Sequence, residues 1–152
     1  MNRGAPSRAA LSGPYRRTVY RVEAPAGAID IRIGERHPAL DALLDSHAAR
    51  SWAFVSACNP GSARLAAPEN DARHAALLEA LRARGLSALE GLGIPHGEGW
   101  LPERSVLVPG VDKEEAIEIG RRFGQNAIVF GRRGGRAELL WIRGCRKAAL
   151  TT

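Results

Sequence analysis

The run of residues 52–57, Trp-Ala-Phe-Val-Ser-Ala, constrains the fold most strongly because it is long enough for a central strand buried on both faces. It stops at Asn59-Pro60-Gly61, and four polar or thiol side chains crowd its end: Ser56, Cys58, Asn59 and Ser62. Two further amides, Gln125 and Asn126, open the apolar stretch 127–130. Uncharged hydrogen-bonding groups at strand ends hold either a loop or a ligand, and both alternatives remain open at this point.

Local patterns predict the remaining elements. Apolar alternation or continuous apolar runs predict strands at residues 18–22, 28–33, 52–57, 86–92, 104–108, 127–131 and 137–142. Helical spacing and capping residues predict helices that start at Pro38, at Pro68 and after the capping box formed by Asp112 and Glu115. The glycine-rich residues 91–100 are interpreted as a loop. The order β-β-α-β-α-β-β-α-β-β predicts an α/β (α+β) fold, a mixed sheet with about three helices packed on it.

The length of 152 residues indicates one domain. We expect a disordered basic tail over residues 1–14, the α/β domain over residues 15–143 and a second basic tail over residues 144–152. No secretory signal or apolar run of membrane-spanning length is present. The two cysteines, Cys58 and Cys145, show no paired spacing, so we expect no disulfide framework and a cytoplasmic location.

The net charge of +6 comes from the ends of the chain. Residues 1–21 and 143–152 contain eight of the 22 basic residues and no acidic one, whereas the remaining 14 basic residues are matched by 16 acidic ones. A nucleic-acid groove requires basic residues clustered on the folded body. We therefore expect nucleic acid as a partner only through weak, salt-sensitive contacts of the tails.

Four short motifs, in this order, resemble the bacterial family known as domain of unknown function 3293. They are the strand end at residues 56–62, Glu69-Asn70, the Trp100-x-x-Glu103-x-Ser105 segment, and residues 123–129. The family more often has Thr and a ring-bearing residue at positions 56 and 58, and proline at position 104. The resemblance covers about residues 15–142 and implies a shared fold and a shared pocket, with no established reaction.

Strand direction decides whether these motifs meet. The strands that begin near Arg104 and Ala127 are joined through a helix, so as neighbours in one sheet they would be parallel, with coinciding amino-terminal ends. Glu103 and Ser105 would share one face of their strand. The end of the strand at 52–57 joins the same rim only if that strand runs antiparallel to the other two.

If the motifs meet, they form a polar ligand site. The predicted ligand-binding residues are Ser56, Asn59, Asn70, Trp100, Ser105, Gln125 and Asn126. Glu103 is the only carboxylate among these predicted rim residues and is the predicted acid/base. Cys58 is a candidate nucleophile that needs a base, and no spacing assigns His74 or His96 to that role.

No metal-ligand spacing, dinucleotide fingerprint or Walker motif is present, so we expect no metal and no cofactor. The sequence predicts a protein that binds a small polar ligand, nucleotide- or sugar-like, with a hydrolase or transferase activity left open. The alternative is a non-enzymatic adaptor that contacts nucleic acid through its basic tails. A monomer or a homodimer, paired through exposed strands, is expected.

Overall fold

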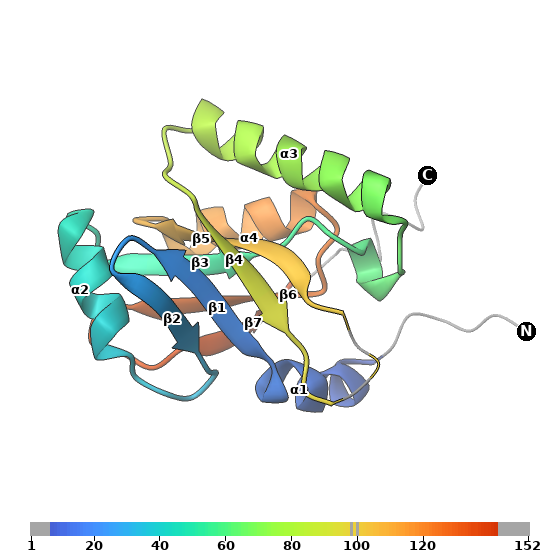
Figure 1. Ribbon diagram of the computed structural model, residues 1–152, viewed down its shortest axis with the longest axis horizontal. Coiled ribbons are helices and arrows are strands. Elements are labelled where there is room, and N and C mark those ends of the chain that lie inside the picture. The colour runs from blue at the N-terminus through green and yellow to red at the C-terminus, as the bar shows by residue number, and fades with distance from the viewer. Residues whose placement is uncertain (1–6, 98, 100, 143–152) are drawn as a thin grey trace, which may run out of the picture.

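The computed structural model describes residues 7–97, 99 and 101–142 (Figure 1). Along the chain it contains α1 (Arg8–Arg17), β1 (Val19–Ala24), β2 (Gly27–Ile31), α2 (Pro38–Ser46), β3 (Ser51–Val55), the short 3-10 helix η1 (Pro60–Ser62), α3 (Ala67–Ala83), β4 (Leu89–Ile94), β5 (Glu103–Pro109), α4 (Lys113–Arg122), β6 (Ala127–Arg132) and β7 (Glu138–Trp141). The expected α+β domain is confirmed, and the predicted helices and strands are present in their predicted sequence, with α1 and η1 in addition.

The seven strands form one sheet in the order β2-β1-β4-β5-β3-β6-β7. Every pairing in this sheet is antiparallel, so the predicted mixed sheet is wrong. The prediction failed because β3 lies between β5 and β6. The two strands that α4 connects point the same way but are not neighbours, and no parallel pair forms.

The amino-terminal region also differs from expectation. Residues 8–17 form α1, although the sequence predicted a disordered tail over residues 1–14. The Ser7 side chain accepts a hydrogen bond from the Ala10 amide, and Tyr20 Oη donates to the Tyr15 carbonyl at 2.8 Å, which ties the helix to β1. Residues 1–6 and the predicted tail at 144–152 lie outside the described residues.

Strand β4 begins three residues later than predicted and takes in part of the expected glycine-rich loop. Gly91 pairs with Val22 on one side and Ser105 on the other. A Cβ atom at position 91 would lie 2.5 Å from the Arg21 carbonyl oxygen and 2.9 Å from the Phe54 ring. The glycine therefore permits close strand packing here rather than marking a loop.

Each face of the sheet carries its own apolar core. Helices α3 and α4 cover one face, where Leu77, Leu81 and Ile119 pack against β3, β5 and β6. Helix α2 packs with Leu40 and Leu44 on the other face, against Trp52, Phe54 and Leu107 among others. At the opposite end of that second face α1 lies over the sheet (Figure 1).

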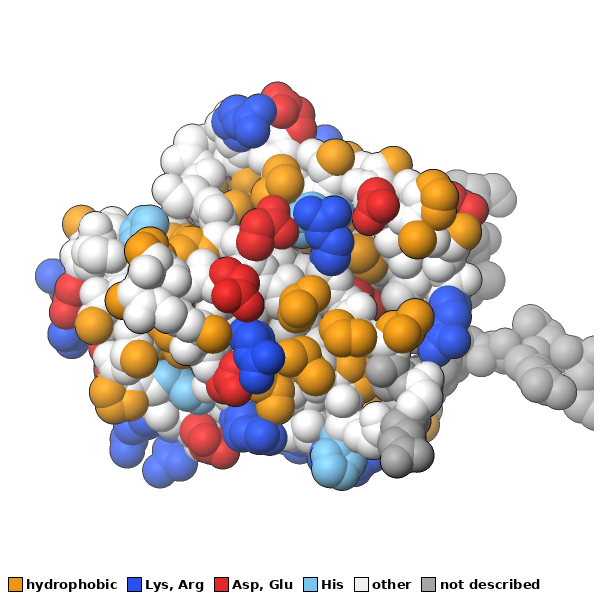
Figure 2. All heavy atoms as spheres, in the orientation of Figure 1, with side chains coloured by type: hydrophobic (Ala, Val, Ile, Leu, Met, Phe, Trp, Pro, Cys, Tyr) orange, Lys and Arg blue, Asp and Glu red, His pale blue; other side chains and the backbone are white. Residues whose placement is uncertain are grey.

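The surface shows no strong charge segregation on the face drawn in Figure 2, where acidic and basic side chains of the described residues alternate. Apolar side chains gather in the middle of that face, between α3 and α1. Within the described part of the chain, no helix has the length and apolar character needed to cross a membrane.

We expect Phe130→Ala in β6 to lower the free energy of unfolding by about 3–5 kcal/mol, because Phe130 is fully buried and its loss leaves a cavity. Leu101→Ala is the control, since Leu101 is 76% exposed and its loss should change stability by less than about 0.5 kcal/mol. Urea unfolding followed by circular dichroism measures both. Equal effects of the two substitutions would contradict the assigned core.

Candidate functional site

The antiparallel placement of β3 between β5 and β6 brings the two polar strand ends together. The carboxyl end of β3 meets the amino ends of β5 and β6, which is the condition that the sequence left open. Hydrogen bonds join the motifs directly, among them Asn59 Nδ2 to Glu103 Oε2 at 3.0 Å, Gln125 Nε2 to the Cys58 carbonyl at 3.1 Å, and Asn126 Nδ2 to Ser62 Oγ at 2.8 Å.

Asn59 is the centre of this arrangement. Its backbone amide donates to Asn70 Oδ1 at 2.9 Å, and its side-chain oxygen accepts from Asn70 Nδ2 and from the Leu65 amide, each at 2.9 Å. Its backbone is left-handed, with φ 47°, and Ser62 is left-handed as well, with φ 66°. Left-handed backbone is tolerated best by glycine and asparagine, so position 59 calls for an asparagine on two independent grounds.

Arg73 on α3 fastens the two polar strand ends to each other. Its guanidinium donates to the backbone carbonyls of Ala57 and Phe123, one from each motif. The Gly61 amide also donates to the Gly124 carbonyl at 2.7 Å. Gly124 has φ +70°, and a Cβ atom there would lie 2.8 Å from Pro60 Cβ, so the two loops approach closely only with glycine.

The buried hydroxyl and thiol groups are held by backbone atoms. Ser56 Oγ donates to the Arg104 carbonyl at 2.9 Å and accepts from the Cys58 amide at 3.0 Å. Ser105 Oγ donates to the Glu103 carbonyl at 3.1 Å. The Cys58 thiol lies 3.9 Å from the Asn70 carbonyl oxygen, and burial is the main cause that raises its pKa, opposed by the Ser56 side chain. This thiol is set up to pack rather than to ionise and attack.

A cavity of about 630 Å³ opens beside these residues, between α1 and the second face of the sheet. Its wall is polar at the rim, where Asn59, Glu103, Ser105, Gln125 and Asn126 lie. Much of the rest of the wall is apolar and aromatic, from Leu11, Pro14 and Tyr15 of α1 and from Tyr20, Phe54 and Val129 of the sheet. This volume and this division suit a small organic ligand.

Glu103 is the outstanding group of the cavity. The side chain is half-buried, and burial raises the pKa of its carboxyl, opposed by the hydrogen bond from Asn59 and by the nearby Ser56 side chain. Among the described residues it forms no ion pair, although nine other ion pairs are present. A carboxyl held in a cavity without a cation is a signal of function rather than of stability.

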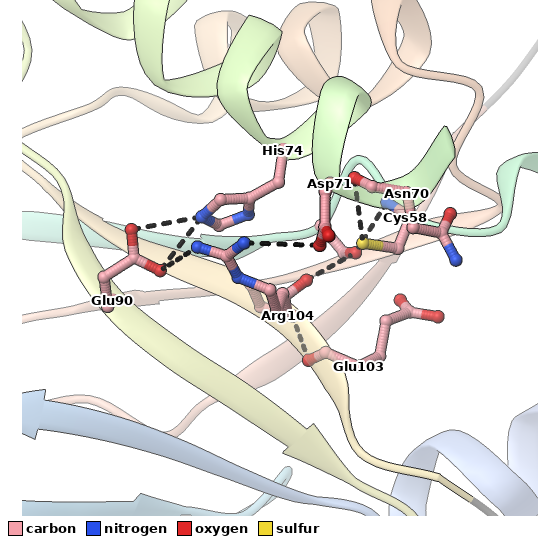
Figure 3. A network of polar contacts seen from close by, with 9 residues as sticks. Cys58, Asn70, Asp71, His74, Glu90, Glu103 and Arg104 are labelled. Atoms are coloured by element: carbon pink, nitrogen blue, oxygen red, sulfur yellow. Dashed lines mark hydrogen bonds and ion pairs between the residues drawn. The ribbon is translucent and has the colours of Figure 1, made fainter. Parts of the chain in front are cut away.

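Arg104, the next residue, points to the opposite face of β5, as alternation along a strand requires (Figure 3). There it lies 3.5 Å from Asp71 and 3.6 Å from Glu90, and Glu90 also contacts His74 Nε2 at 2.9 Å. His74 thus contacts Glu90 through Nε2, and among the described residues no hydrogen bond joins it to Cys58. Figure 3 shows the Glu103 carboxyl on the other side of the strand from this ionic chain.

The structure collects eight of the nine predicted site residues around one cavity. Trp100 lies outside the described residues. Most of the amides turn out to hold backbone atoms, so their predicted ligand contacts stay untested, whereas Glu103 faces the cavity. No group of three or more metal-binding side chains occurs in the parts of the chain that the structure describes.

Two residues of the site were missed from the sequence. Tyr15 enters the cavity wall from α1; burial raises the pKa of its hydroxyl, which interacts with the Ser62 and Asn126 side chains. Arg73 was missed because it lies on a helix outside every motif. The only sequence signal for Arg73 was its position beside the buried stripe of α3, one residue before His74.

The comparisons with known proteins agree with the resemblance seen in the sequence. The model of the family described as "Protein of unknown function (DUF3293)" matches residues 55–128, a segment that runs from the end of β3 to the start of β6. It therefore contains Asn59, Asn70, Glu103 and Gln125. No curated protein and no solved structure matches the chain.

We expect Asn59→Ala to destabilise the protein by about 2–4 kcal/mol, because it removes three partly buried side-chain hydrogen bonds and leaves alanine in left-handed backbone. Asn126→Ala is the matched control; it removes the exposed bond to Ser62 and the interaction with the Tyr15 hydroxyl and should cost less than about 1 kcal/mol. Urea denaturation compares the two variants. A smaller loss for Asn59→Ala than for Asn126→Ala would refute the central role of Asn59.

The raised pKa of Glu103 predicts a pH-dependent effect of Glu103→Gln. A carboxyl whose pKa is higher in the folded state contributes stability that is fully present below its ordinary value of 4.5 and is lost as the pH rises through the folded pKa. The glutamine variant should therefore gain stability relative to the wild type as the pH rises from 4.5 to 7.5. Unfolding at several pH values, with the exposed Glu79→Gln as control, tests this; a difference that is independent of pH would argue against it.

Proposed function

Because the chain belongs to DUF3293, a family of unknown function that it matches over residues 55–128, we propose its function from the geometry of the site: it binds a small molecule in the cavity between α1 and the sheet. One observation carries this proposal. The half-buried Glu103 carboxyl faces a cavity of about 630 Å³ without an ion-pair partner among the described residues.

The division of the cavity wall defines the kind of ligand. A polar rim at the strand ends and a wall of aromatic and aliphatic side chains suit a molecule with a polar edge and a flat apolar body. Nucleosides and aryl glycosides combine these features. The nucleotide- or sugar-like ligand expected from the sequence thus remains the leading class, with the ring on the apolar wall.

Glu103 is the residue that we propose for any proton transfer at this site. A pKa raised by burial brings both protonation states of a carboxyl closer to neutral pH, as general acid–base catalysis requires. A hydrolase or transferase activity would use Glu103 in this role. Cys58 is not part of the proposal, because its thiol is buried beside a carbonyl and its pKa is raised.

The alternative function, contact with nucleic acid through basic tails, concerns the predicted tails at residues 1–14 and 144–152, of which residues 1–6 and 144–152 lie outside the described residues. Truncation separates the two functions. Since α1 supplies part of the cavity wall, the deletion must spare residues 7–17 and remove only residues 1–6 and 143–152. Cytoplasmic location and the monomeric or dimeric state stay predictions.

A thermal-shift screen of nucleosides, nucleotides and sugars tests the proposed cavity. A ligand at 100 times its Kd should stabilise the wild type by about 2.7 kcal/mol. Gly93→Val should abolish this stabilisation, because Gly93 lines the cavity and a Cβ atom there has no neighbour closer than 3.8 Å, so the added side chain fits the strand and fills the space. Ala88→Val, just before β4, is the control. Binding that survives Gly93→Val would place the ligand elsewhere.

A further inference from the structure

Most hydrogen-bond donors of the polar rim already donate to other groups of the protein. Asn70 Nδ2 donates to Asn59 Oδ1 and to the Leu65 carbonyl, and Gln125 Nε2 donates to the carbonyls of Cys58 and Phe123. An amide nitrogen has two hydrogens, so both groups are saturated.

The other rim donors are used in part. The hydroxyl hydrogens of Ser56 and Ser105 are directed to backbone carbonyls, and Asn59 and Asn126 each donate one of their two amide hydrogens to a side-chain oxygen. Beside the remaining N–H of these two amides, the rim presents acceptors to the cavity: the Glu103 carboxylate first, then the lone pairs of Ser105 Oγ. A ligand that is to pair with Glu103 must bring the donors.

The charged residues around the cavity also favour a ligand that brings hydrogen-bond donors. Two arginines line the cavity, and Arg104 is directed to the far face, where Asp71 and Glu90 hold it. Arg64 is exposed and already engaged in an interaction. The carboxylate of Glu103 thus faces the cavity without a cation beside it among the described residues, and a buried charge is stabilised strongly by an opposite charge that it hydrogen-bonds.

The apolar wall is also suited to a cation on a flat body. Tyr20 and Phe54 pack edge to face, with ring centroids 5.3 Å apart, and Tyr15 lies on the α1 side of the cavity. The Tyr20 hydroxyl is already bonded to the Tyr15 carbonyl, so this residue offers the ligand its ring rather than its hydroxyl. Aromatic faces attract cations and stack on flat ligands.

We propose that the ligand binds Glu103 through an amidine-like N–C–N group, which donates two N–H bonds to the carboxylate, and lays a flat apolar body against the aromatic wall. This inference rests on the proposed ligand cavity and narrows its ligand class. Guanidines, amidines and the amino-substituted edge of a nitrogen heterocycle belong to this class. Simple sugars, carboxylates and phosphates do not, because they bring too few N–H donors or a repelling charge.

Three probes with the same ring and different head groups test the proposal: benzamidine, benzamide and benzoate. Protein-observed NMR titrations measure each Kd on the wild type and locate the shifted resonances. Benzamidine should bind at least about tenfold more tightly than benzoate and benzamide, because its two N–H donors and its charge pair with Glu103. Shifts should concentrate on residues around Glu103, Tyr15 and Gly93.

Glu103→Gln should weaken benzamidine by about tenfold or more and leave benzamide within about twofold, while the exposed Glu79→Gln should change neither. Far-UV circular dichroism of each variant confirms that it is folded. A glutamine variant that binds benzamidine as tightly as the wild type overturns the proposal.

Affinity should also depend on pH in opposite directions for the two charged probes. As the pH rises and Glu103 loses its proton, benzamidine should bind more tightly and benzoate more weakly. Other titratable or charged groups share the cavity: Tyr15, Tyr20, Cys58, Arg64, Asp71, His96 and Arg104. Histidine in general changes its charge between pH 5 and pH 8, so the same experiment on a His96→Asn variant, which should keep the trend, excludes that residue as its source.

The failure of this inference differs from the failure of the proposed function. Tighter or equal binding of benzoate or benzamide, lost in Gly93→Val, would overturn the amidine-like class and leave the cavity function standing. If benzamidine does not bind at all, the amidine-like class is overturned, and the nucleoside and sugar screen then decides on the cavity by itself.

Discussion

The site depends on one topological fact, that β3 lies between β5 and β6 and runs antiparallel to both. This placement brings one carboxyl end and two amino ends of strands to the same rim. Its register is fixed by burial, since Phe54 pairs with Leu107 and Val129 on the second face. A slip of one residue would turn Ser105 into the core below α3 and Val106 out of it.

The amides at this rim hold the loops, whereas the Glu103 carboxyl faces the cavity. Asn59, Asn70 and Gln125 each satisfy backbone groups that the tight loops would otherwise leave unpaired. The Asn59 side chain also donates to Glu103. Burial without a cation raises the pKa of Glu103, so this group lowers stability at neutral pH, and we propose that it serves reactivity or binding. The loop alternative is thus realised by the amides, whereas the ligand alternative is our proposal for Glu103.

The sequence predicted what depends on neighbours along the chain. Apolar period, capping box and turn residues placed most strands and three helices within a few residues of their observed bounds. Strand order does not follow from local pattern, so the central position of β3 and the wholly antiparallel sheet were missed. Helix α1 was missed because it has no buried residue of its own and is held by contacts such as that of Tyr15 with Trp141. Tyr15 was therefore missed as well. The sequence placed Gly91 at the overlap of a predicted strand and a predicted loop, because the Phe54 ring that a Cβ atom at position 91 would meet comes from β3 and is distant in sequence.

The polar rim and the apolar wall of the cavity are carried by elements that differ in how strongly they are anchored to the core. The polar rim is built on three paired strands and on the Arg73 clamp, all anchored in the core. Part of the apolar wall comes from α1, whose contacts with the sheet include the Tyr20 hydroxyl bond, the edge-to-face contact of Tyr15 with Trp141 and the cation–π contact of Arg8 with Trp141. Elements with few buried contacts open at low free energy. For the proposed ligand we therefore expect rigid, selective recognition of the polar edge and a fit around the apolar body that adapts with the position of α1.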